Sequence, residues 1–157
     1  MLMDDVRPAP RAESIPGALW TIALVALSPF PLSALVYCYG PAQWSAPALT
    51  TLQAWSAVTL AFLGGVRWGL ETREPSPRIM RQMFSFLCAV AAVVVLLARG
   101  RAPETWILGG FVVAFLIQWL FDHQTPDTPS RYPILSTAVT AAACVSLGLA
   151  LEKAMNG

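Results

Sequence analysis

Five long, mostly apolar segments dominate this sequence, and they run over about residues 17–39, 49–70, 83–98, 106–121 and 134–151. A helix needs about 20 mostly apolar residues to cross the roughly 30 Å hydrocarbon core of a bilayer. Five such segments in 157 residues leave too little chain to cover them in a water-soluble domain. The sequence therefore predicts an all-α integral membrane protein, with a bundle of five transmembrane helices in a single domain over residues 15–153.

The composition also favours a lipid bilayer as the surroundings of the chain. Charged residues make up 12% of the sequence, whereas soluble domains carry about 25%. The formal net charge of +1 is far from the dense basic surface that nucleic-acid binding requires, so a nucleic-acid partner is excluded. Residues 1–14, rich in proline and charge, are expected to form a mobile cytoplasmic tail.

The distribution of arginine predicts the orientation in the membrane, because positively charged loops tend to stay in the cytoplasm. One end of the predicted bundle carries Arg7, Arg11, Arg73, Arg78, Arg81 and Arg131, with Arg67 at its edge. The other end carries Arg99, Arg101 and Lys153. We therefore expect a cytoplasmic N-terminus and a periplasmic C-terminus. The excess of arginine over lysine and the abundance of alanine are typical of GC-rich bacterial genomes, so we expect a multi-pass protein of a bacterial inner membrane.

Cysteine and histidine are too few and too scattered to suggest a metal or redox site. Cys38, Cys88 and Cys144 belong to three different predicted helices and lack the CxxC spacing of such sites. His123 is the one histidine, and no phosphate-binding or hydrolase motif is present. We therefore expect no cofactor, no metal and no enzymatic activity.

The end of the second segment, Phe62–Glu71, combines several signals in the sequence FLGGVRWGLE. Gly65 and Gly69, with Gly64 beside them, form a small-xxx-small pattern that lets another helix approach closely. Whether this motif acts within one chain or between chains stays open. Trp68 is expected to lie as an anchor in the aromatic belt at the membrane interface.

Arg67 and Glu71 are four residues apart and share a helix face. The alternation of helices brings Asp122 and Tyr132 to the same, cytoplasmic end of the bundle. Our hypothesis is that Arg67 pairs with Glu71 or Asp122 in a polar cluster there; the alternative is that Arg67 reaches the lipid phosphates and Glu71 is solvated. Two further polar residues, Gln53 and Gln118, are candidates for a polar face inside the membrane.

The run FLGGVRWG at Phe62–Gly69 resembles the signature of the family called domain of unknown function 3429, which includes the transmembrane protein 69-like small membrane proteins. Weaker matches are Ile15-Pro16, Pro29-Phe30, Asp122, and the spacing of Tyr132, Leu135 and Thr140. The resemblance implies a five-helix protein of bacterial inner or mitochondrial membranes, without an established activity. Many members have histidine at the position of Arg67 and arginine at the position of Ser136. Since arginine keeps its proton near neutral pH, a proton-handling role is not expected for the motif here.

Two functions are compatible with these features. The first is a non-enzymatic accessory or interaction subunit of a membrane complex, binding other membrane-protein helices through a glycine-containing face. The alternative is a small oligomeric transporter or channel for a small solute, and an anion would suit Arg67. Because the outer halves of the predicted helices are mostly apolar, a continuous pore is disfavoured.

Overall fold

The described part of the chain contains the five named helices α2 to α6, and all-helical structure was predicted from the sequence. The structure is a computed structural model that describes residues 21, 24–73, 78–124 and 132–156. Its helices are α2 (Pro29–Tyr39), α3 (Ala42–Glu71), α4 (Ile79–Leu97), α5 (Glu104–His123) and α6 (Tyr132–Asn156). The predicted tail over residues 1–14 lies outside the described residues.

Proline and glycine set most of the helix boundaries. Pro29 occupies the first turn of α2, and Pro41 and Pro103 are the N-cap residues of α3 and α5. Proline suits these positions because the first N–H groups of a helix have no partner within it. The turn between α4 and α5 contains Gly100 at a φ of 75°, a conformation that glycine adopts without steric strain.

Helix α3 begins seven residues before the predicted segment, at Ala42 rather than near residue 49. Residues 40–48 lie between two of the predicted segments, and Gly40, Pro41 and Pro47 in this stretch are typical of a loop. Pro47 is the sixth residue of the helix, so it lacks the N–H that would donate to the Gln43 carbonyl, and the helix continues with this one backbone hydrogen bond missing. The Thr51 hydroxyl donates to the Pro47 carbonyl at 2.9 Å and so binds the helix backbone at that point.

Four helices, α3 to α6, are long and apolar enough to cross a membrane. The first predicted span, residues 17–39, differs: its described apolar helix covers Leu24–Tyr39, and it is shorter than these four. Ser28, the residue before Pro29, keeps helical backbone angles, and the Leu32 N–H donates to its carbonyl at 3.2 Å, so the helix continues through this position. Residues 17–20, 22 and 23 of this predicted span lie outside the described residues.

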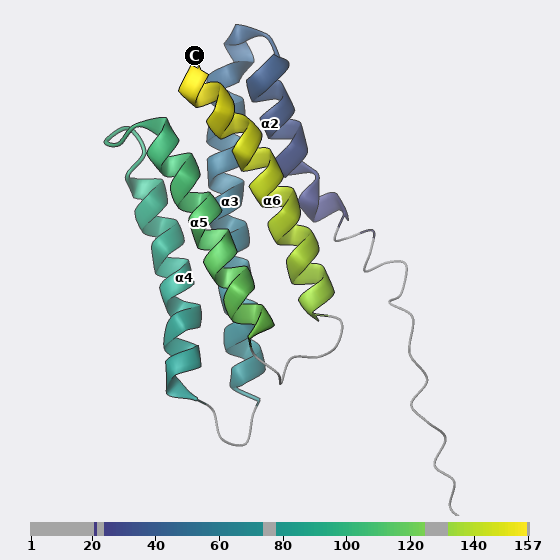
Figure 1. Ribbon diagram of the computed structural model, residues 1–157, viewed down its shortest axis with the longest axis vertical. Coiled ribbons are helices and arrows are strands. Elements are labelled where there is room, and N and C mark those ends of the chain that lie inside the picture. Colours follow the sequence, from purple (N-terminus) through teal and green to yellow (C-terminus); the bar gives the residue numbers. More distant parts are fainter. Residues whose placement is uncertain (1–20, 22–23, 74–77, 125–131, 157) are drawn as a thin grey trace, which may run out of the picture.

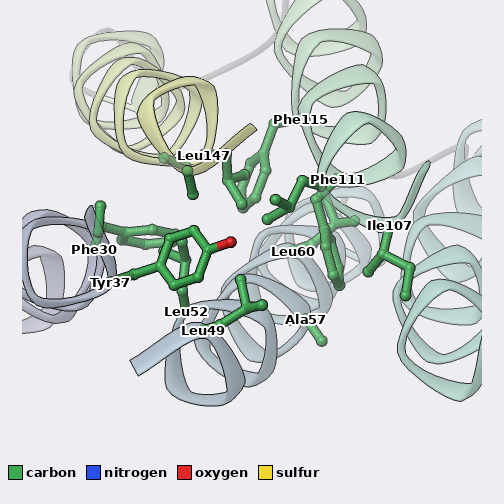
Figure 2. Packing of buried hydrophobic residues seen from close by; sticks show 14 of the residues in the cluster. Phe30, Tyr37, Leu49, Leu52, Ala57, Leu60, Ile107, Phe111, Phe115 and Leu147 are labelled. Atoms are coloured by element: carbon green, nitrogen blue, oxygen red, sulfur yellow. The ribbon is translucent and has the colours of Figure 1, made fainter. Parts of the chain in front are cut away.

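Helix α3 packs against both α2 and α4, while α6 packs against α2 and α5 (Figure 1). The middle of the bundle is filled by apolar side chains that are fully buried, among them Phe30, Leu52, Leu60, Phe111, Phe115 and Leu147 (Figure 2). The rings of Phe30 and Phe115 meet edge to face, with centroids 6.1 Å apart. Large apolar residues also cover the outside, as expected for helices surrounded by lipid.

The two ends of the bundle carry different polar residues. We call one the Asp122 end; it holds the last turns of α3 and α5 and the first turns of α4 and α6 (Figure 1). The other, the Glu104 end, holds the start of α5 and the C-terminal end of α6. The candidate site residues are therefore described end by end.

Candidate functional site

An ion pair between Arg67 of α3 and Asp122 of α5 lies at the centre of the Asp122 end. Arg67 Nε is 3.4 Å from Asp122 Oδ1, and the two side chains are 5% and 0% exposed. Both helices present these residues inward because Arg67 follows Leu60 and Leu63 on the buried face of α3, and Asp122 follows Gln118 on that of α5. The structure thus brings together two residues that lie 55 positions apart in the sequence.

Two further side chains donate hydrogen bonds to the Asp122 carboxylate. The Ser136 hydroxyl of α6 donates to Oδ2 at 2.7 Å, and Gln118 Nε2 donates to Oδ1 at 3.2 Å. A buried carboxylate is stable only when a counter-charge and hydrogen-bond donors replace its hydration. Asp122 therefore joins α3, α5 and α6 at one point.

Helix α4 is connected to the same group through Gln118. Cys88 Sγ of α4 donates to Gln118 Oε1 at 2.8 Å, and Cys88 is buried. We call Arg67, Cys88, Gln118, Asp122 and Ser136 the Asp122 cluster. Cys88 and Ser136 were not predicted as members, because their partners lie on other helices and no sequence spacing connects them.

The Arg67 side chain is enclosed by protein and is only 4% exposed. Its guanidinium carbon lies 5.2 Å from the centroid of the Phe121 ring, and Nη2 donates to the Phe121 carbonyl at 3.5 Å. Phe121 also contacts Phe84 of α4, whose ring stacks on it at a centroid distance of 3.9 Å. This packing contradicts the alternative in which Arg67 extends to lipid phosphates.

Glu71, predicted as a second possible partner of Arg67, connects α3 to α4. Its Oε1 accepts the backbone N–H of Arg78 at 2.8 Å, and its Oε2 lies 3.7 Å from Arg81 Nη1. The bond to Arg78 satisfies a backbone donor at the N-terminus of α4, where a carboxylate is favourable. Tyr132 begins α6, but its side chain lies outside what the structure describes.

Gln53 belongs to the Glu104 end, away from the Asp122 cluster. Its Nε2 donates to Glu104 Oε2 at 2.6 Å, and the side chain is fully buried. Along α5 the buried residues Ile107, Leu108, Phe111 and Phe115 lie between Glu104 and Gln118. The predicted polar face through Gln53 and Gln118 is therefore not continuous. Glu104 was not predicted as a site residue, although an acidic residue in the first turn of a helix is a recognisable sequence signal.

The three glycines of the packing motif have different surroundings. A Cβ atom on Gly64 would lie 2.6 Å from the Ser85 carbonyl oxygen of α4, so α3 and α4 are in close contact there. Gly65 and Gly69 are exposed, and a Cβ atom on either would meet nothing within 4 Å. Trp68 is 44% exposed on the same outer side of α3. Within the described chain, Gly64 makes the helix contact expected of this motif, and Gly65 and Gly69 face outward.

The interactions of the Asp122 cluster connect helices to one another. One cation and one anion neutralise each other, and the amide, hydroxyl and thiol donate within the cluster. Across the described ranges, no three histidine, cysteine, aspartate or glutamate side chains gather closely enough to hold a metal ion.

Comparison with known proteins supports the resemblance found in the sequence. No curated protein and no solved structure gives a significant match to the chain. A family model described as "Protein of unknown function (DUF3429)" matches residues 15–152, which include all of the described helices except the last four residues of α6. This chain therefore belongs to the DUF3429 family.

Proposed function

We propose that this protein is a non-enzymatic accessory subunit of the bacterial inner membrane that binds a transmembrane helix of another membrane protein. The observation that carries the proposal is the open outer face of α3, formed by Ala61, Gly65 and Gly69 at intervals of four residues. Small residues at this spacing let two helix backbones approach closely, which is a main source of helix association in lipid.

Two aromatic side chains border this outer face. Phe62 is 64% exposed and Trp68 is 44% exposed, while Gly65 and Gly69 between them carry no side chain. The two glycines therefore form a shallow strip on the helix surface, with one aromatic side chain on each side of it. A second helix with small residues at the contact fits such a surface, and the aromatic rings add contact area along its flanks.

The interior of the bundle supports this role over transport by a single chain. Four buried apolar residues of α5, including Phe111 and Phe115, separate the Asp122 cluster from the Gln53–Glu104 pair. The polar groups at each end hydrogen-bond to one another rather than line an open path. The outer surface is therefore the favoured place for function.

Crosslinking in the native membrane tests the proposal. A photoreactive amino acid at Phe62 is expected to form an adduct with a membrane protein other than a second copy of this chain. Gly65→Leu is expected to reduce the adduct at least tenfold, because a leucine side chain at this position prevents the close approach of a second helix.

Gly109→Leu is the matched control, since a Cβ atom on Gly109 also meets nothing within 4 Å but belongs to α5. The control should leave the adduct unchanged. An adduct with a second copy alone, or an adduct equally strong in the Gly65→Leu variant, would refute the accessory role.

A further inference from the structure

Two arginines flank the connection between α3 and α4, at the Asp122 end of the bundle. Arg73 follows the last residue of α3 by two positions, Arg78 is the N-cap residue of α4, and both are exposed. The Glu71 carboxylate accepts the Arg78 backbone N–H at 2.8 Å, so the two helix ends lie side by side (Figure 1). Both helices are long enough to cross a membrane. These arginines therefore lie where the chain leaves the hydrocarbon core and meets the lipid headgroups.

The guanidinium groups of Arg73 and Arg78 are available to bind an anion. Two other arginines of this end, Arg67 and Arg81, are each paired with a carboxylate. Within the part of the chain that the structure describes, Arg73 and Arg78 have no side-chain hydrogen bond and no ion pair. The connecting sequence adds one carboxylate, Glu74, so the two arginines leave an excess of positive charge here. A guanidinium carries five N–H donors, and these suit the oxygen atoms of a phosphate.

The outer face of α4 begins directly after Arg78 and is covered by large apolar side chains. An exposed fraction of 61–75% is found for Ile79, Met80, Met83 and Phe86. The residues that α4 buries are the small ones Ser85, Cys88 and Ala92. Helices in lipid associate mainly through small residues, which let their backbones approach closely. The exposed face of α4 therefore suits the acyl chains of lipids better than a second helix.

We propose that an anionic phospholipid binds here, with its phosphate at Arg73 and Arg78 and an acyl chain along the outer face of α4. Charge complementarity favours this occupant, because the two guanidinium groups are positive, exposed and without a partner in the described chain. The order of the parts also agrees, since the cations lie at headgroup depth and the apolar side chains follow them into the membrane. The inference does not depend on the proposed function, because its apolar part lies on α4 and not on the outer face of α3.

Native mass spectrometry in mild detergent, with equal amounts of dioleoylphosphatidylglycerol and dioleoylphosphatidylcholine, tests the site. The two lipids have the same acyl chains, but only the first has a net negative charge. The unmodified protein is expected to retain mainly the anionic lipid. The double variant Arg73→Gln with Arg78→Gln should lower the ratio of anionic to zwitterionic lipid about tenfold, because each cation at the membrane surface adds to the attraction. Both side chains are exposed, so this variant is expected to fold.

The matched control is the double variant Arg99→Gln with Arg101→Gln, which removes the same charge beyond the other end of α4. These arginines already donate within the protein, to the Thr50 hydroxyl and to the Leu97 carbonyl, so the lipid ratio should stay within about twofold. Inorganic phosphate should displace no more lipid than chloride at the same ionic strength, because it has no acyl chain. The proposal is wrong if the unmodified protein retains both lipids equally or if phosphate displaces the lipid. It is also wrong if the two double variants change the ratio to the same extent.

Discussion

Replacing Asp122 with alanine is expected to lower the free energy of unfolding by about 3–5 kcal/mol, the usual effect of removing one partner of a buried ion pair. The substitution leaves the Arg67 guanidinium buried without its carboxylate at 3.4 Å. It also removes the acceptor of the Ser136 hydroxyl and of Gln118 Nε2. Equilibrium unfolding in mixed detergent micelles measures the change.

Two further variants separate charge burial from a general loss of packing. Glu152→Ala removes an exposed carboxylate from α6 and should change stability by less than about 0.5 kcal/mol. The double variant Arg67→Met with Asp122→Leu replaces the pair by apolar side chains and should recover the part of the loss that comes from the unpaired guanidinium, while Ser136 and Gln118 Nε2 still lack their acceptor. If Asp122→Ala is as stable as the unmodified protein, the Asp122 cluster does not hold the helices together.

Gly64→Ala is expected to destabilise the protein by about 1–3 kcal/mol, the range found when extra atoms are forced into a packed interior. The added Cβ would lie 2.6 Å from the Ser85 backbone oxygen, so α3 and α4 must move apart. The adjacent Gly65→Ala is the matched control, because it has open space and should gain about 0.5–1 kcal/mol from the better helix propensity of alanine. Thermal unfolding of the two variants in the same detergent gives the comparison.

Opposite signs for these neighbouring substitutions are the specific result expected from the structure. Equal destabilisation by both would mean that Gly65 is also packed against a helix within the chain. Equal stabilisation would mean that α3 and α4 are not in close contact at Gly64.

The helical segments were predictable because their apolar runs and their proline and glycine boundaries are local signals. The start of α3 was not predictable, because a proline in the second turn of a helix, such as Pro47, cannot be distinguished by sequence from a proline in a loop. The first predicted span is described as a helix over Leu24–Tyr39, and most of its earlier residues lie outside the described part of the chain. Four apolar helices of sufficient length are described, against the five that were predicted.

The candidate site was predictable in part because alternation of helices determines which residues share an end. That rule placed Arg67 and Asp122 together, but it could not choose between Asp122 and Glu71 as partner. The choice depends on how each helix is rotated about its axis. In the structure, Glu71 faces the start of α4, where it accepts the Arg78 N–H, and Asp122 faces Arg67. Gln53 and Gln118 were grouped by face alone, although they lie at opposite ends of the bundle. Rotation and depth are both set by packing between helices.

The Arg67–Asp122 pair also has a consequence for how the protein is made. Ribosomes add about 5–20 residues per second, and Asp122 follows Arg67 by 55 residues. For roughly 3–11 s during synthesis, α3 therefore exists without the carboxylate that neutralises its arginine. The carboxylate that neutralises Arg67 in the folded bundle is thus supplied by a residue that is translated two helices later.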